Sequence, residues 1–451
     1  MSSFYVNFQS FFFSHFFSVI FWGYFFGGIF SQKNLPRSFK RLQKSYALNL
    51  FNYLAIDEVH CCSTWGHDFR PDYKYLGVVR TLCPQVPIIG LTATSTSQVT
   101  EDVKKILNIQ TALVFKSPLN RPNLFYEVRN KPDNQSECLD MLENLLKHEF
   151  RNQSGIIYTL TIKDVQALTN ELNDRGLKVG CYHANLEPQD RSSVHRKWLS
   201  GQVQAVIATI AFGMGIDKPD VRFVIHHCMS KSMENFYQES GRAGRDFQPS
   251  KCILLYKFAD MSRLSTMVFT EQTGLEKLYG IIGYCLSQDQ CRRKLIAEHF
   301  GEDWESSQCS KMCDNCNKKE KSHKLDVTSV AQAANQILAA AKACDGKVTA
   351  LKLIDALLGK GPCKISAWKK PGDLTKSQIE QILAYLIIGG QLREDFHYTP
   401  YNTISYILPG RTKIKSPLML NISNSKVIPK KAGIKRKKND EVIEIDSDFD
   451  D

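Results

Sequence analysis

The first 32 residues of this 451-residue chain contain no lysine, arginine, aspartate or glutamate. Phenylalanine dominates them, and the run from Phe11 to Phe30 has the roughly 20 residues that cross a bilayer as a helix. The stretch also lacks the basic start and the small-residue cleavage site of a signal peptide, which excludes that kind of leader. Two interpretations stay open: a weak membrane anchor, and a non-native or alternative start joined to a soluble body that begins near Pro36. We favour the second.

The chain also lacks the pattern of a disulfide-stabilised secreted domain, although it has 14 cysteines. The adjacent Cys61 and Cys62 and the isolated Cys181, Cys228 and Cys252 stand in apolar or strand-like surroundings, which is typical of reduced intracellular thiols. The composition is 43% hydrophobic and 23% charged, as in ordinary globular proteins. The net charge of +12 is a weak indication of a polyanionic partner.

From residue 50 onward, short β-rich runs alternate with amphipathic stretches, which predicts parallel sheets covered by helices on both faces. "PLNRPNLFYEV", from Pro118 to Val128, is a joint marked by proline and asparagine between two such blocks. The expected strands lie near Leu54, Ile88 and Val114 in the first block, and near Ser154, Val179, Ala205, Val221 and Cys252 in the second.

After about Asp260 the pattern becomes helical, first from Leu275 to His299 and then in two further stretches. "REDFHYTPYNTISYILPG" then predicts a β-hairpin that turns between Thr399 and Asn402. Two or three helices followed by a hairpin is the element order of a winged helix.

An apolar run that begins at Leu54 ends in two adjacent carboxylates, Asp57 and Glu58. Nucleotide hydrolases that use Mg²⁺ place such acids at a strand end, where Asp57 would meet the metal and Glu58 would orient the attacking water. The alternative is a strand whose terminal acids cap a turn. Thr92 and Thr94 follow another β-run and are expected at the same edge, where open parallel sheets bind ligands.

The second block carries a group of residues suited to phosphate. "ATIAFGMGIDKPDV" and "QESGRAGRD" contribute Gly213, Gly215, Asp217, Gln238, Arg242 and Arg245. Planar guanidinium groups match phosphate oxygens, and glycine lets the backbone approach closely. An ion-paired surface turn is the alternative, and the acid pair in the first block favours the nucleotide interpretation.

Four cysteines, spaced C-x17-C-x3-C-x2-C, can bind a metal: Cys291, Cys309, Cys313 and Cys316. Four thiolates are enough for a closed tetrahedral zinc site, whose role is folding and not catalysis. Four unbound buried thiols are the alternative.

"DEVHCCSTWGHDFRPDY", "FGMGIDKPDVRFVIH" and "YQESGRAGRD" resemble motifs of the superfamily 2 helicases and, among these, of the RecQ family. The resemblance covers about Arg37 to Gly410, and no further helical nucleic-acid module follows, as in the short animal members. It implies an ATP-driven motor that moves 3′ to 5′ on single-stranded DNA, and a nuclear role in repair, recombination and replication.

The resemblance also assigns residues. It assigns catalytic roles to Asp57, Glu58, His60, Gln238, Arg242 and Arg245. It places Mg²⁺ and ATP on Asp57, Gly215, Asp217, Arg242 and Arg245, and the family's structural zinc on the same four cysteines.

Single-stranded and forked DNA are the implied partners. Bases would stack on Trp65 and Phe69, with Arg70 near the backbone, at about 1–3 kcal/mol per base. The alternative for these aromatics is core packing. Tyr401 matches the aromatic wedge that the short animal members hold at the fork, although an exposed aromatic at a turn can also be accidental.

The implied fold class is α/β, with two RecA-like parallel-sheet lobes, the first of them incomplete, a helical zinc-binding subdomain and a winged helix. The expected boundaries are an atypical segment at 1–35, the second half of the first lobe at 36–119, the second lobe at 120–262, the zinc-binding subdomain at 263–325, the winged helix at 326–412 and a disordered basic and acidic tail at 413–451.

No phosphate loop of the form G-x-x-x-x-G-K-[ST] occurs, and the nearest string, from Leu357 to Lys364, has the wrong spacing. We therefore expect a chain truncated in its first lobe that, as written, neither hydrolyses ATP nor unwinds DNA. Two functions follow: a RecQ-type helicase of which this sequence is an incomplete or alternatively started version, and a noncatalytic DNA-binding form.

The tail carries two charged motifs. "KKAGIKRKK" suggests a nuclear-import signal or plain phosphate affinity. "VIEIDSDFDD" resembles a motif that binds SUMO by strand addition, with a plain acidic tail as the alternative. The sequence leaves the oligomeric state open, a homo-oligomer included.

Overall fold

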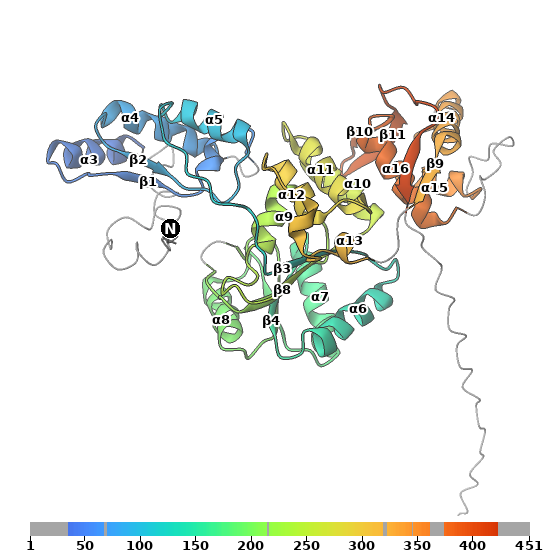
Figure 1. Cartoon of the computed structure of the whole chain (residues 1–451), viewed down its shortest axis with the longest axis horizontal. Coiled ribbons are helices and arrows are strands. Elements are labelled where there is room, and N and C mark those ends of the chain that lie inside the picture. Colours follow the sequence, from blue (N-terminus) through green and yellow to red (C-terminus); the bar gives the residue numbers. More distant parts are fainter. Residues whose placement is uncertain are drawn as a thin grey trace, which may run out of the picture.

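The computed structural model describes residues 35–66, 70–213, 216–318, 323–344, 346–360 and 374–422. Among the predicted features, Phe69, Gly215, the N-terminal segment up to residue 34 and the charged tail from residue 423 lie outside these residues. Figure 1 shows the first block, in blue, and the C-terminal elements, in orange and red, on opposite sides of the central lobe.

The first block is built on a two-stranded parallel sheet, in which β1 (Leu54–Ile56) pairs with β2 (Ile88–Gly90). Helix α5 begins after Thr96, whose side chain accepts a hydrogen bond from the Val99 amide and so caps the helix. The other elements are α3 (Leu35–Ala47), η1 (Val59–Cys62), η2 (Pro71–Gly77), α4 (Val78–Leu82) and α5 (Ser97–Ile106).

One predicted strand of this block is wrong. The run around Val114 forms no strand, and its neighbours Leu113 and Phe115 are 83% and 89% exposed. A strand needs a partner for its backbone groups, and within the described residues this run has none. An apolar run alone therefore did not predict pairing.

The second lobe is a six-stranded, all-parallel sheet with the strand order β3-β8-β7-β4-β6-β5. Its apolar runs are buried on both faces: Ile156 packs into the core cluster on one side of the sheet and Ile157 into the cluster on the other. This burial explains why the runs are continuous rather than alternating, and it confirms the predicted covered sheet.

The strands of this lobe are β3 (Leu124–Asn130), β4 (Ser154–Tyr158), β5 (Val179–Tyr182), β6 (Ala205–Ala208), β7 (Val221–His226) and β8 (Ser250–Tyr256). Its helical elements are α6 (Gln135–Asn144), η3 (Leu145–Glu149), α7 (Ile162–Asp174), α8 (Pro188–Leu199) and α9 (Met233–Ser240).

A helical module follows, with α10 (Phe258–Val268), α11 (Gly274–Leu286), α12 (Arg292–His299), η4 (Ser306–Cys309) and α13 (Asp314–Asn317). The helical pattern predicted from Leu275 to His299 is thus two helices, because the chain turns between Ser287 and Cys291. The cysteines stand in the turns and short helices of this module.

The C-terminal elements are α14 (Thr328–Ala343), α15 (Ala350–Leu357), α16 (Lys376–Ile388), β10 (Leu392–Tyr398) and β11 (Thr403–Pro409). The last two form an antiparallel hairpin, and the Thr399 amide donates to the Asn402 carbonyl at its turn. The predicted hairpin is confirmed, and three helices before it give the element order expected of a winged helix.

The predicted start of the tail at residue 413 is wrong. β12 (Met419–Ile422) pairs antiparallel with β9 (His323–Asp326), and Ile422 is fully buried. The two strands are short and nearly a hundred residues apart, so no local period in the sequence marks them. Among the described residues, no helix is long and apolar enough to span a bilayer.

Candidate nucleotide, metal and DNA sites

Asp57 and Glu58 lie directly after β1, as predicted. Glu58 has φ 50° and ψ 44°, a left-handed conformation that is uncommon for a residue with a Cβ. The Glu58 amide donates to Asp57 Oδ1 at 2.9 Å. A non-glycine residue held in this region costs about 1–3 kcal/mol and is concentrated at functional sites.

His60 connects the acid pair to the segment after β2. Its ring is 2% exposed, and Nδ1 lies 2.9 Å from Thr92 Oγ1 and 3.4 Å from Glu58 Oε2. The Thr92 hydroxyl donates to the Thr94 carbonyl at 3.1 Å, so the His60 nitrogen is the donor toward Thr92. The structure thus places Glu58, His60 and Thr92 together at the end of the two-stranded sheet.

The two lobes meet at the acid pair. Gln238, on α9, donates from Nε2 to Glu58 Oε1 at 3.2 Å. The predicted acid of the first lobe and the predicted glutamine of the second, 180 residues apart, are therefore in contact.

The two arginines after α9 contact described residues on either side of positions 214 and 215 in their own lobe. Arg242 donates to the Gly213 carbonyl, and Arg245 Nη1 donates to the Ile216 carbonyl at 2.7 Å and lies 3.4 Å from Asp217 Oδ1. Partial burial, followed by the neighbouring Arg242, lowers the pKa of Arg245. A bound phosphate would offset the repulsion between the two cations.

The sequence did not predict the residues that hold the turn containing Arg242 and Arg245. Arg121 Nη2, in the joint between the lobes, donates to the Ala243 carbonyl at 3.1 Å and to the Gly244 carbonyl at 2.8 Å. Asn123 Nδ2 donates to the Gly244 carbonyl at 2.9 Å. Gly244 has φ +55°, and a Cβ there would collide with the Asn123 amide. The only signal in the sequence was an arginine and an asparagine at a proline-marked joint.

The described residues predicted to bind DNA lie in two regions, with Trp65 and Arg70 between η1 and η2 and Tyr401 in the C-terminal hairpin. Trp65 is 39% exposed, and the Trp65 and Gly66 carbonyls accept from Lys277 Nζ on α11 at 2.8 and 2.7 Å. The Arg70 guanidinium lies 6.0 Å from the centre of the Tyr73 ring. Tyr401, at the tip of the β10–β11 hairpin, is 97% exposed.

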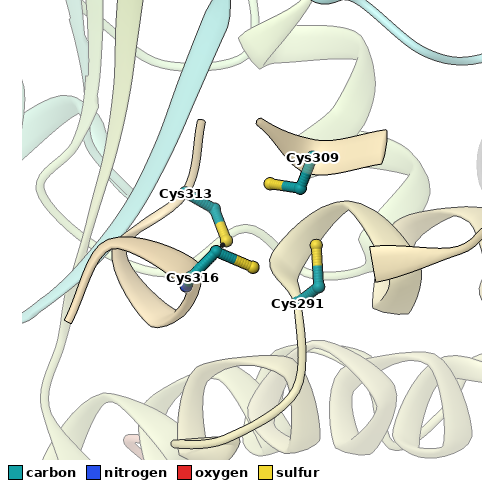
Figure 2. A group of neighbouring side chains, drawn as sticks. All are labelled: Cys291, Cys309, Cys313 and Cys316. Carbon is teal, nitrogen blue, oxygen red and sulfur yellow. Dashed lines mark hydrogen bonds between the residues drawn. The ribbon is translucent and has the colours of Figure 1, made fainter. Parts of the chain in front are cut away.

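The four predicted cysteines come together. All four sulfurs lie within 4.8 Å of one another, and Figure 2 shows them directed toward a common centre. Cys291 precedes α12, Cys309 ends η4, Cys313 caps α13 and Cys316 lies within it.

The chemistry of this cluster fits a soft divalent cation. A hydrogen bond with Cys291, and then burial, raise the pKa of Cys313 above the ordinary thiol value, because both favour the protonated thiol over the thiolate. A bound cation would reverse this effect, and four thiolates are a common zinc ligand set.

A buried ion pair fixes the geometry around the cysteines. Arg292 Nε donates to Asp314 Oδ1 at 2.8 Å, and the two side chains are 1% and 8% exposed. These residues directly follow Cys291 and Cys313. The Val128 amide on β3 donates to Asp314 Oδ2 at 3.2 Å, which ties the cluster to the edge of the second lobe.

Two family models match the chain. The model described as "Helicase conserved C-terminal domain" matches residues 137–246, which include β4 to β7 and α9, and "RecQ zinc-binding" matches residues 258–317, which include all four cysteines. The matched class is that of the superfamily 2 helicases.

Curated relatives agree with these models. "ATP-dependent DNA helicase Q1" of Pongo abelii is 49% identical over 82% of this chain and 57% of its own length. "Putative ATP-dependent DNA helicase Q1" of Caenorhabditis elegans is 45% identical over 82% of this chain and 59% of its own length. A solved structure, "Structure of Mycobacterium smegmatis helicase Lhr bound to ssDNA and AMP-PNP", matches with 19% identity and a TM-score of 0.40 over 83% of this chain and 44% of that chain.

The chain belongs to the RecQ family of helicases. It spans less than two thirds of the length of the curated relatives named above.

Proposed function

We propose that these residues are part of an ATP-dependent DNA helicase that moves 3′ to 5′ on single-stranded DNA. Its substrates are forked or branched duplexes in nuclear DNA repair, recombination and replication. The observation that carries this proposal is the contact between Gln238 and Glu58, because it joins the acid pair of one lobe to the glutamine and arginine segment of the other. In such a motor, nucleotide binds between two lobes and hydrolysis changes their separation.

The nucleotide site has distinct roles for its residues. Asp57, exposed at the end of β1, would hold Mg²⁺, which neutralises phosphate charge when bound. Glu58 would orient the attacking water, and His60 keeps Glu58 aligned with Thr92. Arg242 and Arg245 would leave their loop carbonyls to contact the phosphates. Asp217 lies 3.4 Å from Arg245 Nη1, and Gly215, to which the resemblance also assigns nucleotide binding, lies outside the described residues.

We assign structural zinc to the four-cysteine cluster. The sulfur geometry and the match to the RecQ zinc-binding model support this assignment. All four ligand positions are filled by protein, so the site has no open position for a substrate and serves folding.

DNA would contact two regions. Bases would stack on Trp65 and Phe69 with Arg70 at the backbone, and the winged helix of residues 326–412 would carry Tyr401 to the duplex end as a wedge. The near-complete exposure of Tyr401 at the hairpin tip supports the wedge, since it leaves the ring free to stack on a base at the duplex end.

For the 451 residues themselves we propose DNA binding without ATP hydrolysis. They contain no Gly-Lys-Ser or Gly-Lys-Thr loop, so the β- and γ-phosphates would lack their backbone amides and lysine. Purified chain mixed with MgATP and forked DNA is expected to release no phosphate above background. A DNA-stimulated activity that Asp57→Ala abolishes would contradict this proposal.

The second candidate is a noncatalytic DNA-binding protein that uses the second lobe, the zinc module and the winged helix. The absent phosphate loop favours it. Affinity for forked DNA that is the same with and without ATP supports this candidate. Transcripts that encode a Gly-Lys-Ser loop upstream of Asp57 support the helicase. The proposed nuclear-import and SUMO-binding motifs lie in residues 426–451, outside the described part of the chain.

A further inference from the structure

A buried carboxylate lies at the base of the β10–β11 hairpin, where an apolar side chain is expected. Alternate residues of β10, namely Leu392, Glu394, Phe396 and Tyr398, share one face of the hairpin, and Leu392 and Glu394 are buried there. Arg393 is exposed on the other face. Glu394 is 8% exposed, so its carboxylate has almost no contact with water.

Three hydroxyl groups from three different elements surround this carboxylate. Ser405 Oγ, on β11, donates to Glu394 Oε1 at 2.6 Å, and Ser265 Oγ, on α10, lies 2.7 Å from the same oxygen. Tyr279, on α11, donates its hydroxyl proton to Glu394 Oε2 at 2.9 Å. Both oxygens of the buried acid are thus satisfied without a cation, and in the described residues no cation forms an ion pair with Glu394.

The hydrogen bonds connect the hairpin to the helices before the cysteine cluster. α10 and α11 belong to the helical module, whereas β10 and β11 belong to the C-terminal elements, and Figure 1 shows the two pairs side by side. A second contact runs in the same direction: Phe269, just after α10, stacks on Phe396 with ring centres 4.4 Å apart and an angle of 19°. The hairpin is therefore held at two points along one face.

A hydrophobic residue at position 394 could be buried equally well, but it would not fix the orientation of the hairpin. A buried acid is costly unless it is fully hydrogen-bonded, and burial raises the pKa of Glu394 while the three hydroxyls oppose that rise. In return, hydrogen bonds restrict both distance and angle, whereas apolar packing tolerates rotation.

The position of the hairpin tip depends strongly on the angle at its base. A strand rises about 3.3 Å per residue, so the tip lies on the order of 20 Å beyond Glu394, and a tilt of ~10° at the base would move it by ~3 Å. That displacement is comparable to the spacing between stacked bases of 3.4 Å per strand. A tip that must enter a duplex end therefore needs a fixed base.

We propose that Glu394 is a positioning residue that fixes the direction in which the hairpin presents Tyr401, by tying β10 and β11 to α10 and α11. The proposal rests on the proposed function only in the assumption that Tyr401 contacts the duplex end of forked DNA. The direction of the hairpin is a property of the free protein and can be measured without DNA.

Electron spin resonance distances test the direction. Nitroxide-bearing unnatural residues replace the exposed Tyr401 and the exposed Leu199 at the end of α8, and the distance distribution between them is recorded. Glu394→Leu is expected to broaden the distribution. Glu394→Gln, whose carbonyl still accepts from both serines, is expected to retain most of its sharpness. Asp395→Asn, on the opposite face of the same strand, is the matched control and should leave it unchanged.

A fork containing 2-aminopurine at its junction, without ATP, tests the consequence in protein that keeps Tyr401. Glu394→Leu removes the acceptor for three hydroxyls, and one such hydrogen bond alone corresponds to a factor of about three. The variant is therefore expected to reduce the increase in junction fluorescence by about threefold or more, while fork affinity stays within about twofold. If Glu394→Leu fails to fold, Tyr279→Phe and Ser405→Ala replace it, since each removes one donor.

The outcomes separate the two proposals. A distance distribution in Glu394→Leu, or in the two donor variants, as sharp as in the wild type overturns the role of Glu394. Wild-type protein that does not bind forked DNA refutes the proposed function, and the distance experiment still decides the role of Glu394.

Discussion

Gln238 Nε2 donates a hydrogen bond to Glu58 Oε1 at 3.2 Å, and this bond joins α9 of the second lobe to the acid pair of the first. Glu58 is held in a left-handed backbone conformation, which costs about 1–3 kcal/mol and needs contacts around it to persist. The bond is therefore expected to restrain the segment that follows Glu58.

Replacing Gln238 with alanine tests this restraint. A hydrogen bond to a charged group contributes about 1.5–3 kcal/mol, so amide exchange in η1, Val59–Cys62, should accelerate by about tenfold or more. Hydrogen exchange with mass spectrometry measures it. Gln248→Ala, at an exposed glutamine of the same lobe, is the control. Equal exchange in both variants would show that the cross-lobe bond does not restrain the acid pair.

The zinc assignment predicts metal loss on changing one ligand. Wild-type chain should carry about one zinc ion, and Cys313→Ser should carry little, because three thiolates and a weakly acidic hydroxyl bind zinc far less tightly. Metal binding is coupled to local folding, so protease cleavage between α11 and α13 should appear at the same time. Elemental analysis and limited proteolysis measure the two effects.

Cys344→Ser is the matched control for the zinc prediction, since Cys344 is exposed and outside the cluster. It should keep its metal and its protease resistance. Full zinc content in Cys313→Ser would rule out the site.

The sequence predicted the parts of this molecule that have local patterns. Five strands of the second lobe were recognisable because their apolar runs are largely buried, and the cysteines because zinc ligands have few spacings. The sixth strand, β3, was wrongly taken as part of the joint from Pro118 to Val128, because its proline and asparagine indicated a turn and its residues are only partly buried. The pairing of β9 with β12 was missed, because short strands far apart in sequence have no period in common. The partners of Glu394 were missed for a related reason, since hydroxyls of serine and tyrosine on the paired strand and on two helices more than 100 residues away carry no spacing signal.

An acid-dependent loosening is expected where α9 meets α12. Glu234 Oε1 lies 3.2 Å from His299 Nε2. Burial would raise the pKa of Glu234, but the hydrogen bond and the charge of His299 outweigh it and lower the pKa from 4.5 to about 2. The ionised carboxylate therefore stabilises the fold above pH 4.5, and this contribution is lost as the pH falls toward 2. Its size is on the order of 3 kcal/mol.

Hydrogen exchange in α9 and α12 measures this contribution, because a chain of several domains has no single free energy of unfolding. Glu234→Gln should lower the local opening free energy at pH 7 and flatten its decline between pH 4.5 and 2. Zinc is also lost in acid, but this loss affects the wild-type protein and Glu234→Gln equally. Glu276→Gln, at an exposed position on α11, should behave as wild type. An equally steep decline in Glu234→Gln would refute the assignment.

The wedge proposal predicts that Tyr401 is needed to open the duplex but contributes little to folding or to fork affinity. Its ring is 97% exposed and contributes nothing to the core, so Tyr401→Ala should fold normally. Fork affinity should fall by less than about tenfold, since stacking of one base contributes about 1–3 kcal/mol among many phosphate contacts. Opening of the junction base pair, followed by 2-aminopurine fluorescence without ATP, should largely disappear, because the other residues of the turn, Thr399, Pro400 and Asn402, carry no aromatic ring. Phe115→Ala removes a ring that is 89% exposed in the segment between the lobes, and it should leave both properties intact. Junction opening by Tyr401→Ala at the wild-type level would mean that the ring is exposed for another reason.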